Sequence, residues 1–223
     1  MQILWTLQDT SGANAGSWPW IQFNNEPWEA YDSRDYGAIL AGLAIGMAPD
    51  DYRSDPAIQP ALDRLRSYLD RAYPEQAPVR RVAMLWLSTR LPGVLSPDRR
   101  RTIIDEIWSL QRPDGGWCLA ALGGPWKRRD GTTQAMQSDG YATGLAVLAL
   151  QQSGISADDP RLHHGLAWLA GNQDQDGYWS GFSLNKRRIR LDDAARFMDD
   201  AATAYAVLAL TQKRPAPTVA GQR

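Results

Sequence analysis

The chain has 223 residues, with 24 lysines and arginines against 25 aspartates and glutamates. The net charge of −1 leaves no bulk positive field, which argues against nucleic acid as a partner. The single cysteine, Cys118, excludes an internal disulfide and a cysteine zinc cluster. Mean hydropathy is −0.44, and no apolar run approaches the roughly 18 residues that a membrane-spanning helix needs. Residues 1–8 lack the pattern of a signal peptide.

Two kinds of apolar segment alternate along the chain. One kind has apolar residues on a single face, which is typical of a helix at the surface. The other kind is rich in alanine and apolar on nearly all sides, which is typical of a helix buried among others. In chain order, the pattern predicts a surface helix and then a buried helix in four successive pairs, at residues 1–8 and 35–46, 57–72 and 78–90, 97–111 and 137–152, and 160–172 and 198–212. No segment has the period of two that a sheet would show.

The connections between the paired helices carry a repeated motif. Gln111, Gly115 and Trp117 have the spacing Gln-x3-Gly-x-Trp, and the same spacing recurs 62 residues later, ending at Trp179. A looser copy ends at Trp18, whereas residues 73–77 form only a short proline-containing turn. We therefore expect one repeat domain over residues 1–212, followed by a loose tail over 213–223.

This repeat resembles that of the squalene–hopene and oxidosqualene cyclases and related prenyltransferase-like proteins. The resemblance implies an all-α fold, a partial α/α toroid with an inner and an outer layer of helices. It also implies that each motif glutamine caps a neighbouring helix and that each motif tryptophan stacks on it. A complete toroid has about six helix pairs, but the pattern here predicts four. We therefore expect either a piece of a longer protein or open helix edges covered by an upstream domain or by a second copy.

The resemblance points to an acid that starts a cyclisation. The family motif is D-x-D-D-T-A, and the closest stretch is residues 197–202, which places Asp199 at the proton donor and Asp200 beside it. Phe197 replaces the first aspartate of the motif and Ala201 replaces the threonine. The alternative is that Asp199 and Asp139 are simply N-caps of buried helices, because aspartate is a preferred N-cap residue.

Three long loops, at residues 18–35, 117–139 and 179–199, should emerge at one end of the fold, where the buried helices begin. Long ordered loops are often functional. If a cation forms, the resemblance implies an aromatic wall around it, made by Trp28, Tyr36, Trp126, Tyr141 and Tyr205. Asn185 and Lys186 stand in a basic stretch that could bind an anionic headgroup. The alternative is that these cations pair with carboxylates on neighbouring loops.

Two hypotheses for function follow. The first is a cyclase-like protein that handles an isoprenoid or similar apolar substrate, without an organic cofactor. The second is a non-catalytic toroid that binds a ligand or a partner domain through its Gly-Trp loops. No metal site is expected, because Cys118 lacks the D-x-C pattern of zinc prenyltransferases and His163 and His164 lie on a surface helix. The compartment stays open, with contact to a membrane surface among the options.

Overall fold

The computed structural model describes residues 2–23, 28–30, 32–49, 52–124, 126–189 and 192–212. Within these ranges every regular secondary-structure element is a helix. No strand is present, and Glu29 forms only an isolated bridge. The prediction of an all-α fold is therefore confirmed. The predicted tail over residues 213–223 lies outside the described residues.

The seven longer helices fall into two groups. The predicted buried segments give α2 (Arg34–Gly46), α4 (Pro78–Arg90), α7 (Gly140–Gln152) and α9 (Asp193–Leu210). The predicted surface segments give α3 (Gln59–Ala72), α5 (Pro97–Ser109) and α8 (Pro160–Gly171). The shorter elements are α1 (Gln2–Thr6), α6 (Leu119–Gly123) and the 3-10 turns η1 (Tyr52–Ser54), η2 (Pro56–Ile58) and η3 (Tyr73–Glu75). No pattern of residues predicted α6.

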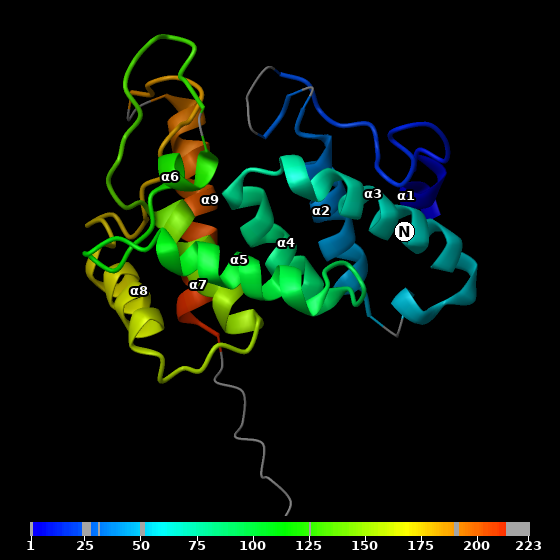
Figure 1. Cartoon of the computed structure of the whole chain (residues 1–223). Coiled ribbons are helices and arrows are strands. Elements are labelled where there is room, and N and C mark those ends of the chain that lie inside the picture. Colours follow the sequence, from blue (N-terminus) through cyan, green and yellow to red (C-terminus); the bar gives the residue numbers. More distant parts are fainter. Residues whose placement is uncertain are drawn as a thin grey trace, which may run out of the picture.

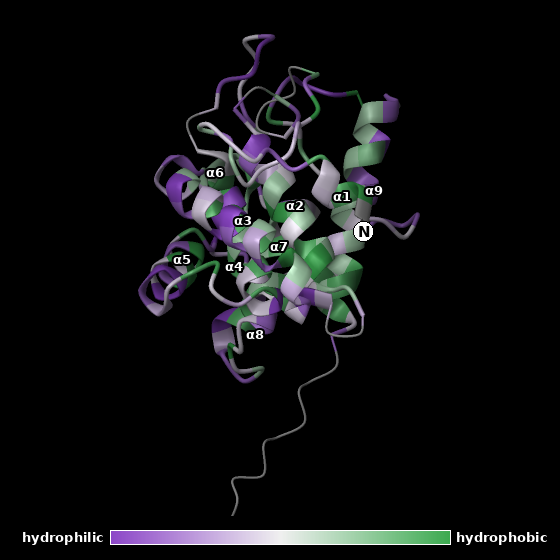
Figure 2. Ribbon diagram, turned by 90° about the vertical axis from the view of Figure 1, so that its right-hand side faces the viewer, coloured by the Kyte–Doolittle hydropathy of each residue, from purple (hydrophilic) through white to green (hydrophobic). Residues whose placement is uncertain are grey.

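The two groups form two layers (Figure 1). In one layer α2 contacts α4, α4 contacts α7, and α7 contacts α9. In the other layer α3 packs on α2, α5 packs on α4, and α8 packs on both α7 and α9. Figure 2 shows the corresponding contrast in hydropathy, with α5 largely hydrophilic and α2 mostly hydrophobic or neutral. The chain thus alternates between the layers.

The helix α7 lies at the centre of the core. All of its residues from Ala142 to Leu150 are buried, because α4, α8 and α9 cover it on different sides. Alanine and glycine allow these close approaches: a Cβ built on Gly144 would lie 2.7 Å from the backbone nitrogen of Ala206 in α9. Residues Ser96 and Asp159 cap α5 and α8, each ahead of a first-turn proline, as the sequence indicates.

The first two motif loops each fasten a surface helix to the next one in the outer layer. The side-chain amide of Gln111 donates to the carbonyl of Arg161 in α8 at 2.8 Å, and that of Gln8 donates to the carbonyl of Ala61 in α3 at 3.0 Å. The indole N–H of Trp117 donates to the carbonyl of Ile107 at 2.7 Å, at the end of α5. The same ring fills the space above Gly165 of α8. Gln111 and Trp117 thus both contact α8, the next outer helix.

The third motif differs from the other two. The backbone approaches the next outer helix at Gly16 and Gly115, where an added Cβ would lie 2.0 Å from the carbonyl oxygen of Arg64 and 2.6 Å from that of His164. At Gly177 an added Cβ would meet only Gln173, at 3.9 Å. Among the described residues, no further outer helix follows α8. Within the described residues, the loop of the third motif therefore has no outer helix packed against it.

The prediction that segment 198–212 is buried on all sides is wrong. Side chains along α9 are exposed at Phe197, Val207, Leu208 and Leu210. The reason is that, within the described part of the chain, α9 packs against α7 and α8 and no other helix makes a contact of similar extent with it. In the described ranges no helix combines the length and apolar character needed to cross a bilayer.

Candidate functional site

A pocket of about 330 Å³ opens at the end of the fold where α2 and α7 begin and where α9 passes. Three separate parts of the chain contribute five tryptophan and tyrosine side chains to its lining: Trp20, Trp28, Tyr36, Tyr141 and Tyr205. Leu40, Leu119 and Leu184 add apolar surface. The pocket is therefore mainly aromatic and aliphatic, as small-molecule sites commonly are.

The aromatic rings form a continuous series of contacts. The ring of Trp28 lies 5.1 Å from that of Tyr36 and 5.4 Å from that of Tyr141, centroid to centroid. Tyr141 and Tyr205 meet edge to face at 5.0 Å. The indole N–H of Trp20 donates to the carbonyl of Trp28 at 2.6 Å, which holds the loop against the first turn of α2. Rings fixed in this way present their faces without a further ordering cost.

The tyrosine hydroxyls stay neutral at physiological pH. Burial raises the pKa of Tyr36, and hydrogen bonding to the hydroxyls of Tyr141 and Tyr205 only partly opposes this effect. Burial raises the pKa of Tyr141 and Tyr205 as well, and the neighbouring phenols add to the shift. The three hydroxyls can therefore donate or accept hydrogen bonds, but they do not supply a phenolate.

The helix α9 provides one wall of the pocket. Ala194, Phe197, Met198, Ala201 and Tyr205 recur at helical spacing and all line it. Phe197 is 70% exposed and stands at the open side. Phe197 and Met198 were not predicted as lining residues, although they belong to the same motif that singled out Asp199. Trp20 stands among the aromatic residues of the long loop over residues 18–35, but it was not assigned to the aromatic wall.

The two predicted catalytic residues lie outside this lining. Oδ1 of Asp199 accepts a hydrogen bond from the backbone N–H of Gly181 at 2.9 Å, and Asp200 is exposed to solvent. Asp199 is not an N-cap either, because α9 begins at Asp193 and is capped by Asp192. That alternative prediction is wrong for Asp199, because the helix starts more than one turn earlier than the pattern indicated.

Asp139 is the N-cap of α7, as predicted. One carboxylate oxygen accepts from the backbone N–H of Ala142 at 2.9 Å, and the other accepts from that of Leu119 at 2.6 Å. The side chain is buried, and this burial raises the pKa of Asp139 to about 7 against the opposing effect of the backbone hydrogen bonds. The residue connects the first turn of α7 to α6, whose Leu119 lines the pocket.

The basic loops pack against each other. The guanidinium of Arg128 donates to the carbonyl of Ser183 at 2.9 Å, and the backbone N–H of Arg129 donates to the carbonyl of Asn185 at 2.8 Å. At the pocket rim, Arg188 pairs with Asp192 at 3.2 Å. This pairing agrees with the alternative prediction, in which the cations of the basic loops pair with nearby carboxylates.

The other predicted binding residues are divided between places. Trp28, Tyr36, Tyr141, Tyr205 and Asn185 all line the aromatic pocket. Trp126 lines a different hollow. Lys186 is exposed and lines neither the aromatic pocket nor that hollow. Within the described residues, no group of three or more histidine, cysteine, aspartate or glutamate side chains is arranged to hold a metal ion.

Comparison of the chain with protein-family models, with the curated proteins and with solved structures returned no match.

Proposed function

We propose that this chain binds an isoprenoid or a similar apolar small molecule in the aromatic pocket. The observation that carries the proposal is the convergence of Trp20, Trp28, Tyr36, Tyr141 and Tyr205 from three distant segments. Burying an apolar ligand there would gain roughly 25 cal/mol for each Å² of apolar surface removed from water. The rim adds a few polar groups, including Glu29 and Asn185, which could orient one end of a ligand.

The volume of the aromatic pocket limits the size of the ligand. A cavity of about 330 Å³ corresponds to the space of about ten water molecules, or of about ten to fifteen carbon atoms. That size fits a geranyl or farnesyl chain better than a thirty-carbon triterpene. The open side next to Phe197 would allow a longer chain to extend into solvent.

The relation to the cyclase-type toroid is part of the same proposal. Its support is the alternation of the two helix layers and the matching contacts of Gln8 and Gln111 with the next outer helix. On this proposal the edge at Gln173 and Gly177, together with the exposed face of α9, is covered by an upstream domain or by a second copy. Such a partner would also narrow the open side of the pocket.

Acid-initiated cyclisation, with Asp199 as the acid, is the second candidate. Phe197 and Met198 line the pocket directly before Asp199, and the aromatic wall is suited to hold a cation. Asp199 itself does not line the pocket, and its Oδ1 accepts a hydrogen bond from the backbone N–H of Gly181. We therefore rank ligand binding first. A cyclic product from a linear polyprenyl substrate, lost in Asp199→Asn, would establish the second candidate.

A blocking substitution with a matched control tests the binding proposal. Ala201 lines the pocket, whereas Ala204 is exposed on the same helix and does not. Titration of the wild-type chain with farnesol should quench the fluorescence of the pocket tryptophans. Ala201→Trp should abolish saturable binding, and Ala204→Trp should retain it. Equal binding by both variants, or no binding by the wild type, would contradict the proposal.

A further inference from the structure

A carboxylate belongs to the lining of the aromatic pocket. Glu29 lines the pocket directly after Trp28 in the chain, and the residue is half-buried. Two hydrogen bonds hold the backbone at this point. The indole N–H of Trp20 donates to the carbonyl of Trp28 at 2.6 Å, and the backbone N–H of Phe23 donates to the carbonyl of Glu29 at 2.8 Å. The segment that carries the carboxylate is therefore fixed beside the pocket.

The carboxylate of Glu29 lies near the tyrosine side chains of the pocket. Burial raises the pKa of Tyr36, and the negative charge of Glu29 adds to this rise, which places the two groups within electrostatic reach of each other. Tyr36, Tyr141 and Tyr205 all line the pocket and all keep partial exposure. The faces of aromatic rings carry negative charge density. The lining therefore combines a carboxylate with several ring faces.

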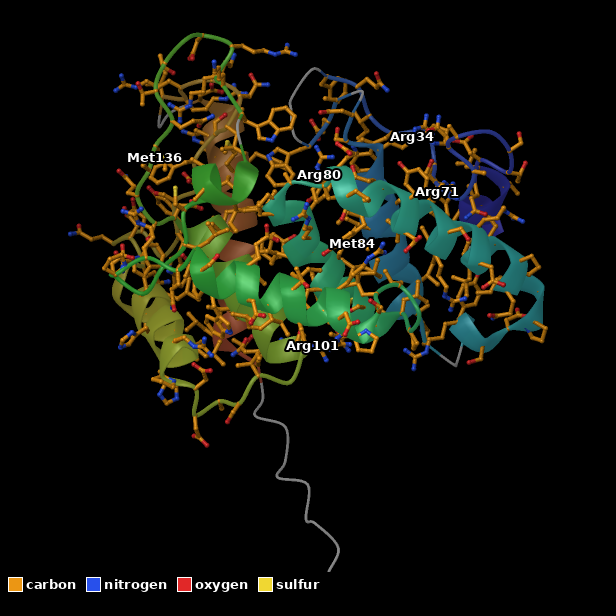
Figure 3. The ribbon with its side chains drawn as sticks, in the orientation of Figure 1. Arg34, Arg71, Arg80, Met84, Arg101 and Met136 are labelled. Atoms are coloured by element: carbon orange, nitrogen blue, oxygen red, sulfur yellow. The ribbon has the colours of Figure 1, made fainter. Side chains whose placement is uncertain are left out.

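Two arginines at this end of the fold have carboxylate partners. Arg188 lines the pocket, and its guanidinium pairs with Asp192 at 3.2 Å. Figure 3 shows Arg80 at the start of α4, on the side toward α2, and this arginine pairs with Asp35 at 2.6 Å. The positive charge of each arginine is thus offset by its own aspartate, so a cationic ligand in the pocket does not meet it as an isolated charge.

We propose that the aromatic pocket selects an apolar chain that ends in an amine or a quaternary ammonium group, with Glu29 as the side chain that recognises the cation. The inference rests on the proposed binding function and adds the chemistry of the polar end of the ligand. The faces of tryptophan and tyrosine attract a cation within about 6 Å of the ring centroid, most strongly where water is excluded. A cation at Glu29 would lie beside Trp28 and Tyr36, whose ring centroids are 5.1 Å apart.

Neutral and anionic end groups fit the same lining less well. An alcohol can hydrogen-bond to the polar groups of the pocket, but it carries no charge for Glu29 to attract. A carboxylate or a phosphate would meet the like charge of Glu29 and the negative faces of the rings. The basic stretch predicted an anionic headgroup, yet Lys186 does not line the pocket and Arg188 pairs with Asp192. The lining therefore favours a cationic end group.

Three ten-carbon ligands that differ only in their end group test the inference: geranylamine, geraniol and geranic acid. Calorimetric titration of the whole chain at neutral pH, where the amine is protonated and the acid is ionised, gives the three affinities. Geranylamine should bind about tenfold or more tightly than geraniol, and geranic acid should bind more weakly than geraniol. In Glu29→Gln the ratio of the amine affinity to the alcohol affinity should fall close to one. Glu75→Gln is the matched control and should keep the wild-type ratio, because Glu75 does not line this pocket.

A second measurement needs no variant. Added sodium chloride should weaken the binding of geranylamine to the wild type more than that of geraniol, because Glu29 is only half-buried and salt screens its charge.

The outcomes separate this inference from the proposed function. If geraniol binds but geranylamine binds no more tightly, the inference is overturned and the binding proposal stands. The same conclusion follows if geranic acid binds most tightly, if Glu29→Gln keeps the wild-type ratio, or if salt leaves the ratio unchanged. If none of the three ligands binds to the wild type, both proposals fail.

Discussion

The backbone N–H of Gly181 donates to Oδ1 of Asp199 at 2.9 Å, on a side chain that the family motif would assign to proton donation. The same contact joins Leu119 to Asp139 one repeat earlier. In both repeats the bonded residue lies two positions after the motif tryptophan, so the carboxylate ties the Gly-Trp loop to the inner helix. These two hydrogen bonds have a structural role, because they hold in place the loops that form the aromatic pocket.

The pH dependence of stability should depend on Asp139. Its folded pKa of about 7 lies above the ordinary value of 3.8, so the folded state holds a proton that the unfolded state releases. The resulting stabilisation is fully present below pH 3.8 and is lost as the pH rises toward 7, by at most about 1.4 kcal/mol per pH unit. Urea unfolding of the wild type and of Asp139→Asn across this window measures it.

The difference in free energy of unfolding between wild type and Asp139→Asn should fall with pH and become flat above pH 7. A difference that is flat between pH 4 and 7 and falls only below about pH 4 would mean that the N-terminus of α7 keeps the carboxylate ionised. Burial would then not be the dominant effect on this residue.

The motif glutamines should differ in their effect on stability. Gln111 donates to Gly115 in its own loop and to Arg161 of α8, whereas Gln173 donates to Gly177 within its own loop. Gln111→Ala should cost about 1–2 kcal/mol, and Gln173→Ala should cost less than about 1 kcal/mol. Chemical denaturation of the two variants compares them directly. Equal losses of stability in the two variants would contradict the conclusion that no outer helix packs against the third motif.

Two glycines of α8 provide a test of the packing between the layers. A Cβ on Gly165 would lie 2.8 Å from Val147 and 2.9 Å from Trp117, whereas a Cβ on Gly171 would meet nothing within 4 Å. Gly165→Ala should destabilise the fold by about 1–3 kcal/mol through overpacking. Gly171→Ala should be neutral or stabilising by up to about 1 kcal/mol. The thermal midpoints should therefore move in different directions, and a tolerated Gly165→Ala would show that Trp117 is free to shift.

Replacing one member of the Asp35–Arg80 ion pair should destabilise the fold strongly, whereas replacing both members should destabilise it only slightly. Arg80→Met leaves the Asp35 carboxylate buried without its partner, and it should cost about 3–5 kcal/mol. Asp35→Leu combined with Arg80→Met should recover most of that loss. Urea denaturation of the single and double variants gives the comparison. A double variant as unstable as the single one would mean that the pair itself stabilises the fold.

Much of the fold could be predicted because its signals are local. The spacing of apolar residues located α4 and α8 almost to the residue, and the motif glutamines and tryptophans indicated how neighbouring helices are fastened. Asp139 was predictable as a cap because it directly precedes an alanine-rich helix. The grouping of Trp28, Tyr36 and Tyr141 was also anticipated, since Trp28 stands in a loop and the two tyrosines stand in the first turns of α2 and α7. Tyr205 was assigned to the same group, although it lies well inside α9.

The remaining features depend on contacts between distant segments. The start of α9 at Asp193 was missed because its first turn is polar and does not continue the apolar pattern. The placement of Trp126 away from the other aromatics follows from α6, a short helix whose signal is too weak to read. The pairing of Asp35 with Arg80 joins two elements 45 residues apart, and neither residue shows in the sequence that it is buried.

Calorimetric titration with geraniol, farnesol and geranylgeraniol tests the central claim most directly, because it asks whether a pocket of limited length takes up the apolar chain. Affinity should increase from the ten-carbon to the fifteen-carbon alcohol and then stop increasing at twenty carbons, since the additional carbons would extend past Phe197 into solvent. Absence of binding by all three alcohols, or an affinity that keeps rising through twenty carbons, would contradict this account of the pocket.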